Sequence, residues 1–405
     1  MKRLLKILCV IFLFGCTGNK EVQAIPYDDE PSYAVLDSFS YGDDYVVPFN
    51  TTIKLEVLRK DDLNVINPIF QDTLQSYAKL FDAYHEYEGI NNIFTINNSY
   101  GKDEKVILEE DLFDLIKEGI NITKLTDGKF NITIGTLFDL WKDKFSPFPV
   151  ENSDPDEKDI NKALGCVVKV EDIDSVIELD DNDNSIVFHK YDGCNDKVKI
   201  DVGAIAKGYA VEKTKEKMSE EEKPFLINIG SSSISTYVPD NEHKDWIIGV
   251  RNPYARVLTL YDYVLQDNGS FTTSGDDSNY FILEGSDGTI RHHILDTKTG
   301  YPNTYIKEAT IFSKEKAYVS DALSTALFNC ETLKERLELI NKVEDYYDID
   351  IKFCYFEEVS SEKGNLITEE DFKYYIMPSS ISDNIENVEV VEWRNYIYKH
   401  LYYSY

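Results

Sequence analysis

The sequence predicts an α+β protein in which strands and helices build one mixed sheet-and-helix body. The chain has 405 residues, of which 42% are hydrophobic and 13% aromatic, and this composition supports a large folded core. Stretches that alternate between apolar and polar residues are interspersed with stretches of helical spacing. They lack the regular alternation of a doubly wound sheet, and the sequence shows no internal repeat.

The N-terminus predicts export. A basic start precedes an apolar run at 4–14 that is too short to span a bilayer and is typical of a signal peptide. The run leads into Gly15 and Cys16, which resemble a bacterial lipobox with an acylated cysteine. We expect a lipoprotein signal peptide at 1–15, a lipid-anchored tether at 16–46 and an extracytoplasmic body at the bacterial cell membrane. An uncleaved anchor would place the body on the same side.

The charge balance excludes one class of partner. The formal net charge is −32, from 74 acidic and 42 basic residues. A chain of this charge offers no basic surface for a phosphate backbone, so we expect no nucleic-acid partner.

The first strand is expected at 52–58, where apolar and polar residues alternate. Apolar residues at helical spacing then predict two amphipathic helices, one from Leu74 to Tyr84 and one from Leu108 to Ile120. The later strands are expected at 166–170, 175–179, 198–202, 225–229, 245–250, 280–283, 292–295 and 309–312. Two further helices are expected, running from about Ala204 to Met218 and from Tyr318 to Cys330.

Four cysteines belong to the expected mature body, namely Cys166, Cys194, Cys330 and Cys354. In an oxidising compartment they allow three disulfide pairings, and the sequence does not choose among them. Their wide spacing argues against a metal cluster.

The first chemical motif runs from Lys199 to Ala210 as Lys-Ile-Asp-Val-Gly-Ala-Ile-Ala-Lys-Gly-Tyr-Ala. A strand is expected to end at Asp201, and Gly203 permits a sharp turn before the helix. Free N–H groups at the helix N-terminus, with Lys207 in its first turn, suit a phosphate. An ordinary tight junction between strand and helix explains this motif alone more simply.

The second motif lies on the helix expected at 318–330. Asp321, Ser324 and Thr325 fall at i, i+3 and i+4, which places three oxygen ligands on one face. A carboxylate with hydroxyls suits Mg²⁺, which prefers hard oxygen donors, and Mn²⁺ is the alternative. Capping and hydrogen bonds to backbone carbonyls explain the same residues equally well.

Two more motifs are weaker when each is taken alone. His292 and His293 neighbour each other on an expected strand, so only one of them faces a site; a period of two places His293 on the face of Leu295. The segment 126–137 is expected to form a turn, a short strand and a glycine break. It suits contact with a flat ring, and a core hairpin explains it equally well.

Taken in order, these motifs resemble the FAD:protein FMN transferase (ApbE) family. The matching segments are 126–135, 201–210, Asn228-Ile229-Gly230, Thr273-Ser274-Gly275-Asp276, 293–302 and 321–326. The resemblance implies an ApbE-like, T-fold-related fold with a single catalytic domain at 47–378, followed by a C-terminal extension of unknown role at 379–405. Asn131 departs from the family pattern, which has aspartate there.

The resemblance also implies roles for individual residues. Metal would be held by Asp321, Thr325 and the main-chain oxygen of Ala204, with Ser324 near. FAD, the substrate, would be contacted by Tyr84, Lys129, Phe130, Asn131, Asp201, Lys207 and Ile294. His293 is the expected general base or acceptor-positioning residue, and Asp276 is the secondary candidate.

The activity implied is metal-dependent transfer of FMN from FAD to a Thr or Ser hydroxyl of a client protein, with release of AMP. The client is expected to carry an Asp-x-x-Thr/Ser-Gly-Ala-Thr-like segment. The alternatives are a metal-dependent FAD pyrophosphatase and a flavin-binding surface lipoprotein without turnover. All three require the turn at 203–207 and the Asp321/Thr325 face to converge in space.

Overall fold

The computed structural model describes residues 28, 31–41, 44–145, 152–240, 242, 246–252, 255–265, 268–276, 279–286, 288–358 and 372–377. The expected signal peptide, the lipidation site Cys16 and the 379–405 extension lie outside these residues. None of the helices in the described ranges combines the length and apolarity that a membrane crossing needs.

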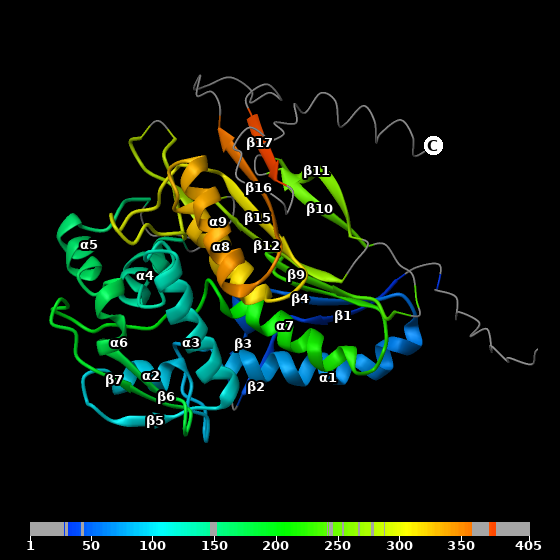
Figure 1. Cartoon of the computed structure of the whole chain (residues 1–405), viewed down its shortest axis with the longest axis horizontal. Coiled ribbons are helices and arrows are strands. Elements are labelled where there is room, and N and C mark those ends of the chain that lie inside the picture. Colours follow the sequence, from blue (N-terminus) through cyan, green and yellow to red (C-terminus); the bar gives the residue numbers. More distant parts are fainter. Residues whose placement is uncertain are drawn as a thin grey trace, which may run out of the picture.

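The largest sheet in the described part of the chain is antiparallel and has eight strands (Figure 1). Every neighbouring pair of its eight strands is antiparallel. The spatial order is β1 (Ser32–Leu36), β4 (Ile53–Val57), β8 (Phe225–Ile229), β9 (Ser233–Tyr237), β12 (Gly269–Gly275), β15 (Glu308–Ser313), β16 (Ile351–Glu358) and β17 (Phe372–Met377).

Three helices pack along this sheet and bury its apolar residues. α1 (Lys60–Leu80) contacts β1 and β4, α7 (Ala206–Ser219) contacts β8 and β9, and α8 (Ala317–Phe328) contacts β12 and β15. The α7 and α8 helices also pack against each other. Because burying apolar surface stabilises the fold, this layer fixes where the side chains of α7 and α8 lie relative to the strands.

A second region lies beside the large sheet, at the left of Figure 1. A three-stranded sheet orders β5 (Lys105–Ile107), β7 (Ser185–Phe188) and β6 (Ile177–Asp180). Its helices are α2 (Ile93–Ser99), α3 (Glu110–Leu125), α4 (Gly135–Lys142), α5 (Glu157–Leu164) and α6 (Ile173–Val176), while α9 (Leu333–Tyr347) contacts both α3 and α8. Three two-stranded pairs complete the strands described: β2 (Phe39–Tyr41) with β3 (Asp44–Val46), β10 (Trp246–Asn252) with β11 (Ala255–Leu265), and β13 (Tyr280–Ile282) with β14 (Ile290–His292). Single 3₁₀ turns lie at Pro48–Asn50, Asp143–Phe145 and Val170–Asp172.

The most regular sequence patterns predicted their elements correctly. The strands expected at 52–58, 225–229 and 309–312 are β4, β8 and β15, and the helices expected to follow residues 204 and 318 are α7 and α8. The first amphipathic helix ends at Leu80, however, so Tyr84 lies in the loop after it and the prediction of a helix through residue 84 is wrong.

Two expected strands are loops instead. Residues 198–202 make only one isolated bridge, between Ile134 and Lys199, and residues 166–170 form a turn and the start of a 3₁₀ helix. Asn97 explains the first case, because its side chain accepts from the Ile200 N–H (2.7 Å) and donates to the Ile200 carbonyl (2.9 Å). This side chain supplies both bonds that a neighbouring strand would make.

Part of the expected tether is folded. Residues 32–36 form β1, which pairs with β4 along its whole length and lies at the edge of the large sheet. Tyr33 and Val35 stay exposed on β1. This exposure at an edge strand explains why the stretch does not stand out as a strand in sequence, and it places the start of the folded body before residue 47.

The described residues contain one disulfide, between Cys166 and Cys194, which belongs to one of the three possible pairing schemes. Cys330 and Cys354 are buried thiols.

Candidate functional site

The α7 and α8 helices approach each other closely at Gly208. A Cβ atom added there would lie 2.7 Å from the Cβ of Asp321 and closer still to the carbonyl oxygen of Ala317. The Gly208 N–H donates a 2.8 Å hydrogen bond to Asp321 Oδ2. The absence of a side chain at residue 208 therefore lets the first turn of α7 pack closely against Asp321 on α8. Gly208 directly follows the turn at 203–207, so the N-terminal end of α7 lies beside Asp321; the approach of that turn to Thr325 stays a prediction.

Hydroxyl groups from β9 and β12 contact the face of α8 that carries Asp321, Ser324 and Thr325. Ser233 Oγ on β9 lies 3.5 Å from Asp321 Oδ1. Ser274 Oγ on β12 lies 2.7 Å from Ser324 Oγ and 3.4 Å from Thr325 Oγ1. Ser233 and Ser274 were not among the predicted site residues. The Thr-Ser-Gly-Asp motif contained the signal for Ser274, because alternation along β12 turns this residue toward α8.

Ser324 and Thr325 differ in how their hydroxyls are used. Ser324 is fully buried, and its hydroxyl donates to the carbonyl oxygen of Asp321 in the preceding turn (2.8 Å). This bond is the backbone contact that competes with the ligand interpretation of Ser324. Thr325 is less buried, and the structure places its hydroxyl next to Ser274.

Two carboxylates share the positive charge of Lys207. Burial raises the pKa of the Asp321 carboxyl, and the Lys207 charge and the Gly208 N–H act against that rise. Burial also raises the pKa of Asp201, which accepts from the Gly203 N–H at 2.8 Å and is likewise stabilised by Lys207. The Lys207 ammonium itself donates to the Gly203 carbonyl (3.2 Å), beside Ala204 in the same turn.

Tyr84 and Asp201 belong to one corner of the site. Tyr84 is 42% exposed, and the Lys142 ammonium lies 4.0 Å from its ring centroid. Burial of its hydroxyl end, followed by the charges of Asp201 and Asp139, raises the pKa of Tyr84. Asp139 pairs with Lys142 (3.1 Å) and with Lys199. Sequence reasoning missed Asp139 and Lys142, although their i, i+3 spacing on the helix after Gly135 is the signal of such a pair.

The segment 129–131 points mainly into the protein. Phe130 is buried in the main apolar core. The Asn131 amide donates to the Val168 carbonyl (2.9 Å), and its oxygen accepts from the Thr133 N–H (2.9 Å). The structure therefore does not present the side chains of Phe130 and Asn131 as a surface for a flat ring. The expected short strand is also absent, since residues 126–134 form turns that lead into α4.

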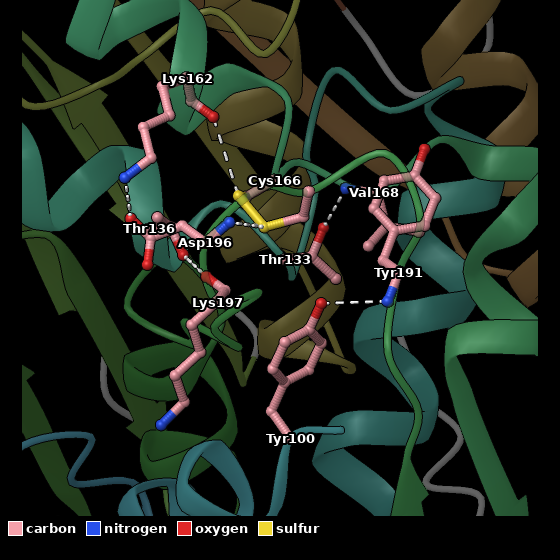
Figure 2. Close-up of a disulfide and its surroundings, with 10 residues drawn as sticks. Tyr100, Thr133, Thr136, Lys162, Cys166, Val168, Tyr191, Asp196 and Lys197 are labelled. Carbon is pink, nitrogen blue, oxygen red and sulfur yellow. Dashed lines mark hydrogen bonds and ion pairs between the residues drawn. A yellow bond between two sulfur atoms is a disulfide. The ribbon is translucent and has the colours of Figure 1, made fainter. Parts of the chain in front are cut away.

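The disulfide supports this same segment (Figure 2). Val168, two residues after Cys166, donates its N–H to Thr133 Oγ1 at 2.8 Å. On the other side of the bridge, the Asp196 N–H donates to the sulfur of Cys194 (3.4 Å). The Asp201 N–H in turn donates to the Ile132 carbonyl (2.8 Å), so two motifs that are distant in sequence lie side by side.

The histidine pair divides between a buried and a half-buried side chain. His292 is 1% exposed; its Nε2 donates to the Asn303 carbonyl (2.7 Å), and its Nδ1 accepts from the Ile294 N–H (3.2 Å). Burial lowers the pKa of His292 to about 3, so the ring stays neutral. Because β14 ends at His292, the period-two argument that paired His293 with Leu295 does not apply. His293 is half-buried, and Ile294 is buried in the core.

Asp276 is committed to an ion pair. Its carboxylate lies 2.9 Å from the Lys307 ammonium, and both side chains are buried. Its N–H also donates to the Lys307 carbonyl (3.1 Å). The remaining predicted residue, Lys129, donates from its ammonium to the carbonyl of Asn329 at the end of α8 (3.2 Å).

Comparison with known proteins decides the family. The ApbE family model matches residues 49–349, about three quarters of the chain. The chain belongs to the ApbE family. Among curated relatives, this ApbE chain is 28% identical to an FAD:protein FMN transferase of Klebsiella pneumoniae, over 65% of this chain and 79% of that protein. It is 25% identical to an FAD:protein FMN transferase of Haemophilus influenzae, over 69% and 77% of the two chains.

Solved ApbE structures share the fold. The crystal structure of the ApbE protein of Thermotoga maritima matches with a TM-score of 0.63 and 25% identity, covering 80% of this chain and 94% of that one. The flavin transferase ApbE of Vibrio cholerae matches with a TM-score of 0.61 and 17% identity over 87% and 98% of the two chains. The predicted ApbE-like α+β fold is thus confirmed.

Proposed function

We propose that the chain transfers FMN from FAD to a Thr or Ser hydroxyl of a client protein and releases AMP. Family membership and the names of the curated relatives support this activity. The observation that carries it in this chain is the 2.8 Å bond from the Gly208 N–H to Asp321. That bond holds a helix N-terminus and its lysine beside a buried carboxylate that also accepts from the Ser233 hydroxyl.

The donor set fits a divalent metal. Asp321, the Thr325 hydroxyl and the Ala204 carbonyl are hard oxygen donors, which Mg²⁺ prefers and Mn²⁺ accepts, and Ser324 lies next to them. No group of three or more His, Cys, Asp or Glu residues suited to a metal occurs among the described residues, so Asp321 would be the main charged ligand. A bound ion would neutralise negative charge on the diphosphate as the phosphorus–oxygen bond to AMP breaks.

The chain's own groups are placed to bind the rest of FAD. Lys207 and the N–H groups at the start of α7 offer positive charge to the diphosphate. Tyr84 and Asp201 lie together at one end of this turn, and Lys129 and Ile294 lie near the C-terminal end of α8.

In the transfer step, the hydroxyl oxygen of the client attacks the FMN phosphorus and the bond to AMP breaks. The hydroxyl proton must pass to a base. His293 is our candidate, because an imidazole titrates near neutral pH. Asp276 is the weaker candidate, since its carboxylate is already paired with Lys307. We expect the client to carry an Asp-x-x-Thr/Ser-Gly-Ala-Thr-like segment.

The test combines FAD, Mg²⁺ and a peptide with that segment, and follows peptide mass and AMP release. Wild-type protein should add one FMN to the peptide. Asp321→Asn should lower the rate by about 100-fold or more, because a charged metal ligand is lost. Asp181→Asn, which changes an exposed carboxylate, is the control. Release of FMN and AMP without peptide labelling would identify a pyrophosphatase, and full activity of Asp321→Asn would exclude this metal site.

We also propose that the protein is exported and anchored through acylated Cys16. The basic and apolar N-terminal segment supports this location. The Cys166–Cys194 disulfide supports it too, because such bonds persist mainly in oxidising compartments. Cys16→Ala should move the protein from the membrane fraction of bacterial cells to the soluble extracytoplasmic fraction. Unchanged membrane association would contradict the anchor.

A further inference from the structure

Three segments of the proposed site meet at Asn329, the residue that caps the C-terminus of α8. Its buried side-chain amide donates one hydrogen bond to the Lys129 carbonyl and one to the Leu295 carbonyl, both at 3.1 Å. Its side-chain oxygen accepts from the Asn303 amide. Both amide hydrogens and the amide oxygen of one residue thus join parts of the chain that are far apart in sequence.

The main chain of Asn329 extends the same connection. Its carbonyl accepts from the Lys129 ammonium (3.2 Å), and its N–H donates to the Thr325 and Ala326 carbonyls (3.3 and 3.1 Å). Asn329 follows Thr325 by one helical turn and Asp321 by two, about 12 Å along the axis. It therefore caps the C-terminal end of the same helix that carries the proposed metal ligands.

His292 links Asn303 to the segment that contains His293, the proposed base. Its ring donates to the Asn303 carbonyl, accepts from the Ile294 N–H, and packs edge-on against Phe328 at 5.1 Å between ring centroids. A neutral ring with one donor and one acceptor satisfies both bonds. The positions of His293 and Ile294 are therefore tied through Asn303 to Asn329.

We propose that Asn329 is a positioning residue for FAD. It holds the Lys129 segment and the 293–295 segment at a fixed place relative to Asp321 and Thr325, so that both ends of the dinucleotide meet prepared groups. The proposal rests on the proposed function. Loss of the amide would leave the buried Leu295 carbonyl and the part-buried Lys129 carbonyl without this donor, and the two segments would shift to recover hydrogen bonds.

Asn329→Asp tests this with an isosteric change, because a carboxylate oxygen would face carbonyls that now receive N–H groups. FAD affinity is measured by flavin fluorescence in EDTA, where no turnover interferes. We expect the dissociation constant to rise about 10-fold, the size expected for losing buried hydrogen bonds. KM for FAD should rise with it, and kcat should change less. Asn303→Ala, which removes the amide that orients Asn329 together with an exposed turn bond to the Tyr305 N–H, should give a smaller change in the same direction.

Asn268→Asp is the matched control. The half-buried Asn268 side chain also bridges main-chain groups, accepting from the Val238 N–H (2.6 Å) and donating to the Val238 carbonyl (3.0 Å). It lies before β12, about 20 Å along the strand from Ser274, so its loss should reduce stability without changing FAD affinity.

The outcomes separate the two proposals. Wild-type protein that does not bind FAD overturns the proposed function and the role of Asn329 together. If wild type binds FAD and Asn329→Asp binds it equally well at a lower unfolding temperature, Asn329 is only structural. If Asn329→Asp does not fold, wild-type affinity in Asn303→Ala overturns the positioning role.

Discussion

At the scale of single residues, several polar side chains in and near the site bond main-chain groups inside the protein. Asn97 and Asn131 each use their amides on main-chain groups of another segment and so take the place of a strand partner. Ser324 uses its hydroxyl within its own helix and on Ser274. Residue type and spacing predicted that these positions matter, but only the folded geometry shows which polar atoms are already bonded internally.

We predict that the stability of the fold depends on pH through His189, which lies outside the site. His189 Nδ1 lies 2.7 Å from Asp103 and its Nε2 lies 3.1 Å from Glu178. Hydrogen bonds to Asp103 and then Glu178 raise the pKa of His189 above its ordinary 6.5. The stabilisation is therefore fully present below pH 6.5 and is lost as pH rises through the raised pKa of the folded state.

The measurement is the free energy of unfolding of wild type and His189→Gln across this range. The difference in unfolding free energy between wild type and His189→Gln should be largest at about pH 5.5 and small at about pH 9. Added salt should reduce it, because both carboxylates are exposed. A difference that stays constant with pH would show that the imidazolium does not contribute.

At the scale of elements, the contact between α7 and α8 at Gly208 sets the geometry of the site. Gly208→Ala should cost about 2–3 kcal/mol of unfolding free energy, because the added methyl meets the backbone of Ala317. It should also lower activity by moving Asp321 away from the turn at residue 203.

Gly119→Ala in α3 is the matched comparison for this prediction. A methyl there also meets a neighbour, but that neighbour is the end of the Ile132 side chain, which can rotate. The gain in helix propensity of about 1 kcal/mol should offset much of the cost. Chemical denaturation of both variants measures the difference, and equal losses would mean that the helix contact is more compliant than the structure indicates.

Elements with a regular spacing of apolar residues could be predicted from the sequence, and elements without such spacing could not. β4 shows clear alternation, and α1 and α3 show helical spacing. Residues 198–202 alternate as clearly, with Val198, Ile200 and Val202 buried, yet Asn97 replaces the ladder there. The position of Tyr84 was also missed, because the helix ends at Leu80 and Asp82 then accepts from the Tyr84 N–H at 2.7 Å.

At the scale of the whole molecule, the site assembles groups from distant parts of the chain. Asp201, Ser274 and Asp321 are brought together by the order β9, β12, β15 and by the helices over those strands. Spacing along the sequence does not encode such long-range neighbours. The order of the motifs predicted the site only through its resemblance to the ApbE family, and the unpredicted residues Ser233, Asp139 and Asn329 contact the motifs from other segments.

The Cys166–Cys194 bridge has a practical consequence for anyone who makes this protein. It joins two cysteines with a sequence separation of 28 residues. Closing such a loop lowers the conformational entropy of the unfolded chain, which stabilises the folded state by about 3–4 kcal/mol. That is a large share of the ~5–15 kcal/mol by which domains are stable. Material produced in a reducing cytoplasm would lack this restraint beside Val168 and Thr133, and weak flavin binding by such material would reflect how it was expressed rather than what the enzyme can do.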